Sequence, residues 1–281
     1  MCIRDRFVGA PILVMLTSKK SPKDILVFFM ILFTLFNIAF ALAPNYSTLL
    51  IARFLTGLPH GAYFGVGTVV ATFLAPKGKE ATYISYMFAG LTLANLFGVP
   101  IGTFIGQNLS WRVSFLLIAS IGLLSILAIV AWVPKIQPNT EVSLNKQLQF
   151  FRTWKAWILI AMISIGTAGL FAWISYISPL VTNVGNLSIT QVPIIMVLVG
   201  LGMFVGNLIG GRLADKYSPN KATIMSFVAM CIILIINFFF VKIPFLNYFL
   251  AFFTGLIAFT IGSPIQMMLI DNARESETLA A

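Results

Sequence analysis

Long apolar runs alternate with short polar segments along almost the whole sequence. Each full run has about as many residues as a helix needs to cross the hydrocarbon core of a membrane, roughly 20, or more. The pattern therefore predicts about eight full transmembrane helices and one partial helix. The full spans are expected at 25–43, 46–75, 81–105, 113–133, 156–180, 192–214, 222–241 and 247–270, and the partial helix at 7–17. Residues 1–6 are interpreted as a non-native leader.

Composition supports an all-α polytopic membrane protein. Hydrophobic residues make up 59% of the 281 residues and charged residues only 9%, and the mean hydropathy is +0.98. A soluble fold of this length could not bury so much apolar surface. The two cysteines, Cys2 and Cys231, provide no disulfide framework. No cofactor and no metal site are expected.

One polar connection, at 134–155, is longer than the others. It is the expected linker between an N-terminal helix bundle at 7–133 and a C-terminal helix bundle at 156–281. A basic hairpin at 211–221 is repeated in weaker form at 19–23, with lysine, serine and proline at matching positions. A hairpin seen twice predicts two related halves, which is a common plan for transporters.

The basic residues indicate the topology, because cytoplasmic loops are enriched in lysine and arginine. With the loops taken alternately, one side carries only Arg112 and Lys242. The other carries Lys19, Lys20, Lys23, Lys77, Lys79, Lys135, Lys146, Arg152, Lys155, Arg212, Lys216, Lys221 and Arg274. The linker and both hairpins are therefore expected in the cytoplasm, with the chain in a bacterial inner (plasma) membrane. The net charge of +10 reflects this topology, so we expect no nucleic-acid partner.

Two polar residues lie inside the span 46–75 and are candidates for ion coupling or for the transport pathway. A buried arginine costs about 2.5–3.5 kcal/mol on insertion scales, so Arg53 is expected to face a cavity or a partner. His60 lies two turns further along nearly the same helix face. The alternatives are that Arg53 extends to the membrane interface and that His60 is a packing residue.

Three groups of residues are candidates for gating or structural motifs. Gly57 and Gly61 form a packing stripe beside Arg53. Gly98, Pro100 and Gly102 combine a glycine stripe with a proline that kinks a helix, although simple tight packing would also explain the glycines. In the basic hairpin, Asp215 can meet a helix N-terminus and its positive dipole end. Gly211 and Arg212 belong to this hairpin, for which a solvated turn is the alternative.

Candidate substrate contacts are polar or aromatic residues within the spans: Asn95, Trp173, Tyr176, Asn207 and Gln266. Trp173 and Tyr176 are three residues apart and share a helix face. Ser263 and Pro264 predict a helix break close to Gln266. Such a set suits a neutral polar ligand such as a sugar, or an amphipathic drug. An amide in a membrane helix is otherwise an interhelical contact.

These motifs resemble those of a known transporter family. The segment 211–221, GRLADKYSPNK, resembles the signature hairpin of the major facilitator superfamily, and 53–61, RFLTGLPHG, resembles its fourth-helix arginine-glycine motif. The segment 98–102, GVPIG, is similar to the fifth-helix motif of the drug–proton antiporter branch, and 110–115 also fits. The segments 57–67, GLPHGAYFGVG, and 199–207, VGLGMFVGN, resemble the bacterial arabinose efflux permeases.

The resemblance implies two six-helix bundles around a central cavity, alternating access and proton antiport. In the twelve-helix numbering of that family, the chain is expected to begin within the second helix and to stop after the tenth. Ser18 stands where the first hairpin of the family carries an aspartate. The acid that often couples protons lies in the first helix, which leaves Arg53 as the matched coupling residue.

The leading hypothesis is a proton-coupled exporter of a small sugar-like or drug-like solute, working as a monomer in the lipid bilayer. An importer or uniporter of the same fold is an alternative, and so is a non-transporting membrane receptor or scaffold. An enzyme is disfavoured because the chain has one histidine, no acid within a span and no nucleophile motif.

Overall fold

The computed structural model describes residues 20–136 and 153–278, and every regular element within them is a helix. The expected all-α class is confirmed. The predicted leader at 1–6, the partial helix at 7–17 and residues 137–152 of the predicted linker lie outside the described residues.

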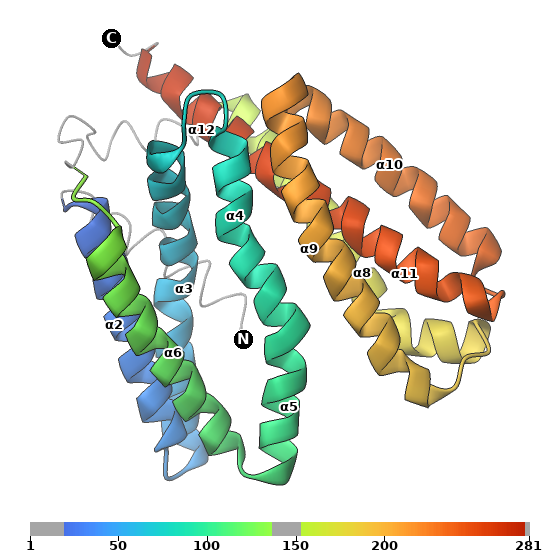
Figure 1. Cartoon of the computed structure of the whole chain (residues 1–281), viewed down its shortest axis with the longest axis horizontal. Coiled ribbons are helices and arrows are strands. Elements are labelled where there is room, and N and C mark those ends of the chain that lie inside the picture. Colours follow the sequence, from blue (N-terminus) through green and yellow to red (C-terminus); the bar gives the residue numbers. More distant parts are fainter. Residues whose placement is uncertain (1–19, 137–152, 279–281) are drawn as a thin grey trace. The chain divides into compact units, whose positions relative to one another are not determined.

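Each of the eight expected full spans falls on helical segments, although those at 81–105 and 247–270 are each divided between successive helices (Figure 1). The α-helices are α2 (Pro22–Ala41), α3 (Tyr46–Leu74), α4 (Glu80–Leu93), α5 (Val99–Asn108), α6 (Trp111–Trp132), α8 (Trp154–Pro179), α9 (Val192–Tyr217), α10 (Pro219–Phe240), α11 (Pro244–Thr260) and α12 (Gly262–Thr278). Two π-helical turns, η1 (Ala94–Gly98) and η2 (Leu180–Val184), and a 3₁₀ turn, η3 (Ile189–Gln191), complete the set.

Six helical segments of the described chain are long and apolar enough to cross a membrane. They are Pro22–Ala41, Trp111–Trp132, Trp154–Val184, Ile189–Tyr217, Pro219–Phe240 and Pro244–Asn272. The other two expected spans are helical as well. The first, α3, carries Arg53 and His60, which lower its hydropathy, and the second, 80–108, is interrupted by η1.

Residue contacts divide the chain into two compact units. The first unit contains Met1–Phe73 and Val99–Leu144, and the second contains Leu74–Gly98 and Asn145–Ala281. By this criterion α4 and η1 belong with the C-terminal helices, although α5 directly continues the same segment of chain. The predicted division at 134–155 into two bundles stays a prediction.

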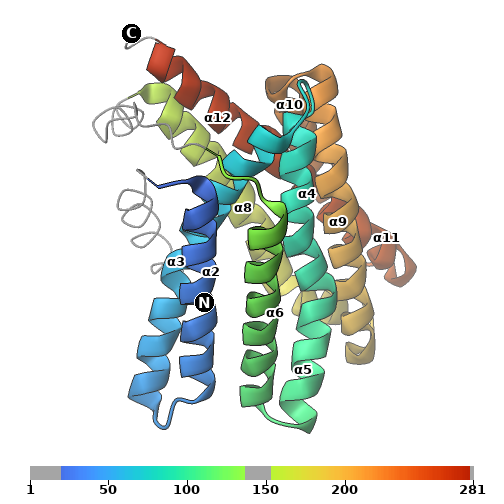
Figure 2. The ribbon, with the colours of Figure 1, turned by 60° about the vertical axis from the view of Figure 1, so that its left-hand side comes forward.

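The first unit packs α2 against α3 and α6. Figure 2 shows α2 turning back into α3 through a short connection. The fully buried Phe29 of α2 packs with Ala62 of α3, and Leu26 packs with Val70 of α3 and Ile129 of α6. This side-chain core stabilises the packing of the three helices.

In the second unit, α9 lies against both α4 and α11 (Figure 1). Gly202, Gly206 and Gly210 face α11 so closely that an added Cβ atom would collide with its backbone. The four-residue glycine stripe therefore lets two helix backbones come into direct contact.

Both basic hairpins lead through serine and proline into a helix. Ser21 precedes Pro22 at the start of α2, and Ser218 precedes Pro219 at the start of α10. Proline is favoured at this first helical position because its missing N–H would have no partner there. Ser218 alone links α9 to α10. Its backbone φ is 115°, a value that residues other than glycine rarely adopt.

Candidate functional site

The carboxylate of Asp215, near the C-terminal end of α9, binds the N-terminus of α4. The backbone N–H groups of Ala81 and Thr82 donate to its two oxygens, each at 2.9 Å, and the Thr82 hydroxyl donates as well. These N–H groups belong to the first turn of a helix, where they have no partner within the helix and where the dipole is positive. Arg212, one turn earlier, is exposed.

Two further residues continue this contact along α9 at four-residue spacing. Gly211 is buried, and a Cβ atom there would lie 2.7 Å from the Ala81 carbonyl oxygen. The Asn207 amide donates to the Ser85 carbonyl oxygen at 2.6 Å. One face of α9 therefore holds α4 through a carboxylate, a glycine and an amide in succession.

Asn207 and Gln266 line one cavity of about 190 Å³ within the second unit. Its walls come from α4, α8, α9, α11 and α12 and are mostly apolar, with Phe88 and Phe259 as the large side chains. Asn207 is only 1% exposed. Besides bonding Ser85, it accepts a hydrogen bond from the Ser263 hydroxyl at 3.4 Å. Its amide thus joins α9 to α4 and α12. The side chain of Gln266 is more exposed than that of Asn207.

The aromatic candidates of α8 have different surroundings. Trp173 packs against the core of the second unit, and its buried indole nitrogen has no hydrogen-bond partner among the described residues. A buried donor left without an acceptor is unfavourable. Tyr176 is 70% exposed. The side chain of Asn95 lies outside what the structure describes, and η1 contains its backbone.

Arg53 is held between aromatic rings in the first unit. Its guanidinium carbon lies 5.4 Å from the ring centre of Phe40 on α2 and 5.4 Å from that of Phe115 on α6. Both distances are within the range of cation–π attraction. Nearby, Arg112 donates a hydrogen bond to the Ala43 carbonyl oxygen at 2.9 Å. Arg53 is half-buried, and it links α3 to α2 and α6.

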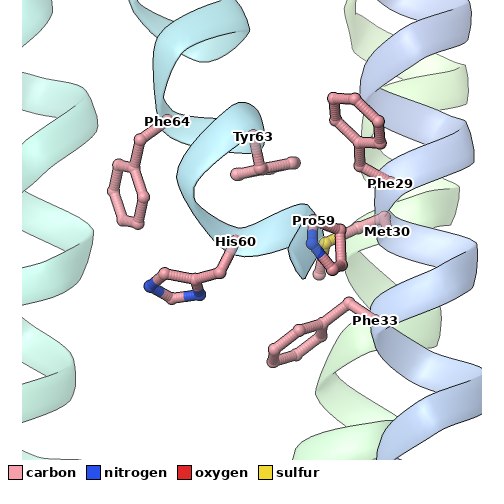
Figure 3. Close-up of a pocket in the computed structure, with 7 residues that line it drawn as sticks. All are labelled: Phe29, Met30, Phe33, Pro59, His60, Tyr63 and Phe64. Carbon is pink, nitrogen blue, oxygen red and sulfur yellow. The ribbon is translucent and has the colours of Figure 1, made fainter. Parts of the chain in front are cut away.

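His60 borders a cavity of about 150 Å³ between α2 and α3 (Figure 3). Its imidazole lies 5.1 Å from the ring of Phe64 and 6.3 Å from that of Phe33, measured between ring centres. The buried Pro59 precedes it within α3. The surface that lines the cavity is apolar throughout.

The proline motif of the fifth span coincides with an irregular backbone. The π-helical turn η1 ends at Gly98, two residues before Pro100. Proline has no N–H to donate, which accounts for an interrupted ladder just before it. A Cβ atom at Gly98 or Gly102 would meet nothing within 4 Å among the described residues. In the fourth-helix motif, by contrast, Gly57 is buried and Gly61 is half-buried.

Sequence reasoning missed several partners. Thr82 and Ser85, in the first two turns of α4, contact α9, and no local signal in the sequence marks them. Lys23 was assigned only to topology, yet its ammonium group donates to the Val130 carbonyl oxygen at 2.8 Å, in the last turn of α6. A lysine there satisfies a free carbonyl and complements the negative end of the helix dipole.

Known proteins resemble this chain over nearly its full length. The profile of the Major Facilitator Superfamily matches residues 6–281. The Escherichia coli K12 protein named "Putative transporter AraJ" is 36% identical over 274 residues, which cover 98% of this chain and 70% of AraJ. YdhP, an inner membrane transport protein of the same organism, is 35% identical over 280 residues, with the same coverage of each chain.

A solved structure shows the same fold. The crystal structure of a variant of FucP, the fucose:proton symporter of Escherichia coli, matches with a TM-score of 0.69. It covers 98% of this chain and 80% of FucP, at 19% sequence identity. Taken with the profile match, these similarities show that the chain, an all-α polytopic membrane protein, belongs to the Major Facilitator Superfamily of transporters.

Proposed function

We propose that the chain is a secondary active transporter that exports a small sugar-like or drug-like solute by alternating access. The bacterial inner membrane is the proposed location, with the linker and basic hairpins in the cytoplasm, protons as the coupling ion and a monomer as the working form. Membership of a transporter family supports transport itself. YdhP is named as an inner membrane protein and FucP as a proton symporter, which favours the proposed membrane and ion.

The observation that carries this proposal is the contact between Asp215 and the first turn of α4. Alternating access needs contacts that hold one state and open in the other. The donors of this contact are two backbone N–H groups at a helix end and the Thr82 hydroxyl, which water can satisfy once the carboxylate leaves. A contact of this kind can therefore open without leaving a buried polar group unpaired.

The residues divide into three proposed roles. Arg53 and His60 are assigned to coupling and the pathway. Gln266 and Trp173 are assigned to the solute, because one borders a cavity and the other has a free indole N–H, and Asn95, Tyr176 and Asn207 complete the set from the sequence. The glycines and Pro100 in the fourth- and fifth-helix motifs, together with the hairpin residues, are assigned to gating.

A vesicle assay tests the proposal. The chain is joined to the AraJ segments that it does not match, reconstituted, and assayed for solute movement with and without a pH gradient. We expect gradient-driven efflux that is lost in Arg53→Ala and kept in Lys242→Ala, which removes an exposed cation in a turn. Efflux that ignores the gradient would contradict coupling, and solute uptake down the same gradient would identify an importer.

A further inference from the structure

The cavity beside His60 is lined almost entirely by rings (Figure 3). Phe29, Phe33, Tyr63, Phe64 and His60 supply aromatic rings, Pro59 a saturated ring and Met30 a thioether. The aromatic rings stand at different angles. His60 is tilted by 38° to Phe33 and by 65° to Phe64, and Tyr63 is at 88° to Phe64.

This lining selects a flat apolar ring over a sugar. Aromatic groups pair best in offset or edge-to-face geometry, and rings at several angles offer both to one further ring. Methionine sulfur also contacts aromatic rings favourably. The hydroxyl groups of a sugar would find no polar surface in the cavity, and buried hydroxyls without partners are disfavoured.

The volume fits one ring. An enclosed apolar cavity of about 150 Å³ in another protein binds benzene or xenon. The cavity here has about the same volume and an apolar lining, but it is partly open. One of its walls is part of a packed core, because Phe29 is fully buried and packs with Ile25 and Ala62.

We propose that the cavity between α2 and α3 binds one uncharged, benzene-sized aromatic ring. That this ring is part of the exported solute rests on the proposed function, and it places the solute among aromatic, drug-like compounds rather than sugars. Binding of the ring itself does not depend on transport.

The experiment measures binding of fluorobenzene by ¹⁹F NMR, with the purified chain in lipid nanodiscs. We expect a bound resonance separate from fluorobenzene dissolved in lipid. Met30→Trp fills the cavity and should weaken binding at least tenfold. The matched control is Ile31→Trp, which adds the same side chain at the next residue of α2, where the native side chain is 39% exposed, and it should leave binding unchanged.

A second variant separates loss of binding from loss of folding, because it is expected to bind a ligand that the native chain does not bind. Phe33→Ala enlarges the cavity and should bind 1-fluoronaphthalene, which we expect the smaller native cavity to exclude. The proposal is overturned if the native chain gives only the lipid signal or if Met30→Trp binds as well as Ile31→Trp. It is also overturned if n-hexane displaces fluorobenzene as readily as benzene does, since the cavity would then hold acyl chains. Failure of the vesicle assay would leave a positive binding result standing.

Discussion

Replacing Asp215 by asparagine tests the contact between α9 and α4. The amide of asparagine keeps one oxygen for one N–H of the α4 first turn, but its NH₂ group faces the other donor. One hydrogen bond to a charged group is lost, which is worth about 1.5–3 kcal/mol, and so is the attraction between the carboxylate and the helix dipole, worth about 0.3–1 kcal/mol. Asp215 is partly exposed, so we take about 2 kcal/mol as the sum, or roughly 30-fold in an equilibrium.

Hydrogen exchange measures this change at the donors themselves. The amide protons of Ala81 and Thr82 exchange when the contact opens, so we expect them to exchange roughly 30-fold faster in Asp215→Asn. The matched control is Glu80→Gln, which removes one negative charge from the same helix terminus without breaking either bond. An equal acceleration in both variants would show that charge at the α4 terminus, and not the bonded contact, protects these amides.

Further predictions concern packing and the polar residues. Gly206→Ala forces a Cβ atom into the backbone of α11 and should reduce stability by about 1–3 kcal/mol in thermal unfolding, whereas Gly169→Ala, with nothing within 4 Å of the new atom, should be neutral or stabilising. Arg53→Lys keeps the charge but replaces the planar guanidinium group between two aromatic rings, and should reduce stability by about 1 kcal/mol in the same assay; no loss would contradict a specific role for the guanidinium plane. Asn207→Ala should destabilise by about 1–3 kcal/mol because it leaves buried polar groups unpaired, while Gln266→Ala should weaken solute binding, measured by titration, and leave the unfolding temperature unchanged.

The helices could be predicted from the sequence because the length of an apolar run is set by the membrane and its ends by local chemistry. The helices that follow Ser21 and Ser218 begin at the next residue, a proline in each case, which is three residues before the predicted starts at 25 and 222. The break expected at Ser263 appears at Ile261, between α11 and α12. The π-helical turn after Pro179 was not predicted, because a proline shows that a hydrogen bond is missing but not how the backbone closes the gap.

The site was less predictable, because its contacts join residues that are far apart in the sequence. The position of Asp215 indicated that it would meet a helix N-terminus, but its partner Ala81 lies 134 residues away, and no local pattern encodes that distance. Helix periodicity placed Trp173 and Tyr176 on one face. It could not show how wide the buried part of that face is, and the structure leaves Tyr176 exposed.

The two faces of α9 imply different mechanical roles. Toward α4 the Asp215 and Asn207 hydrogen bonds flank a single close approach at Gly211, and a modest free energy can exchange those hydrogen bonds for water or other partners. Toward α11 the contact is backbone against backbone along the glycine stripe, where even a small shift opens a gap that no side chain fills and forfeits dispersion contacts. A displacement of α9 from α4 should therefore carry α11 with it. Since α11 supplies Phe259 and α9 supplies Asn207 to the cavity beside Gln266, these two walls would move together, and opening of the α4 contact would change the cavity chiefly at the wall that α4 provides.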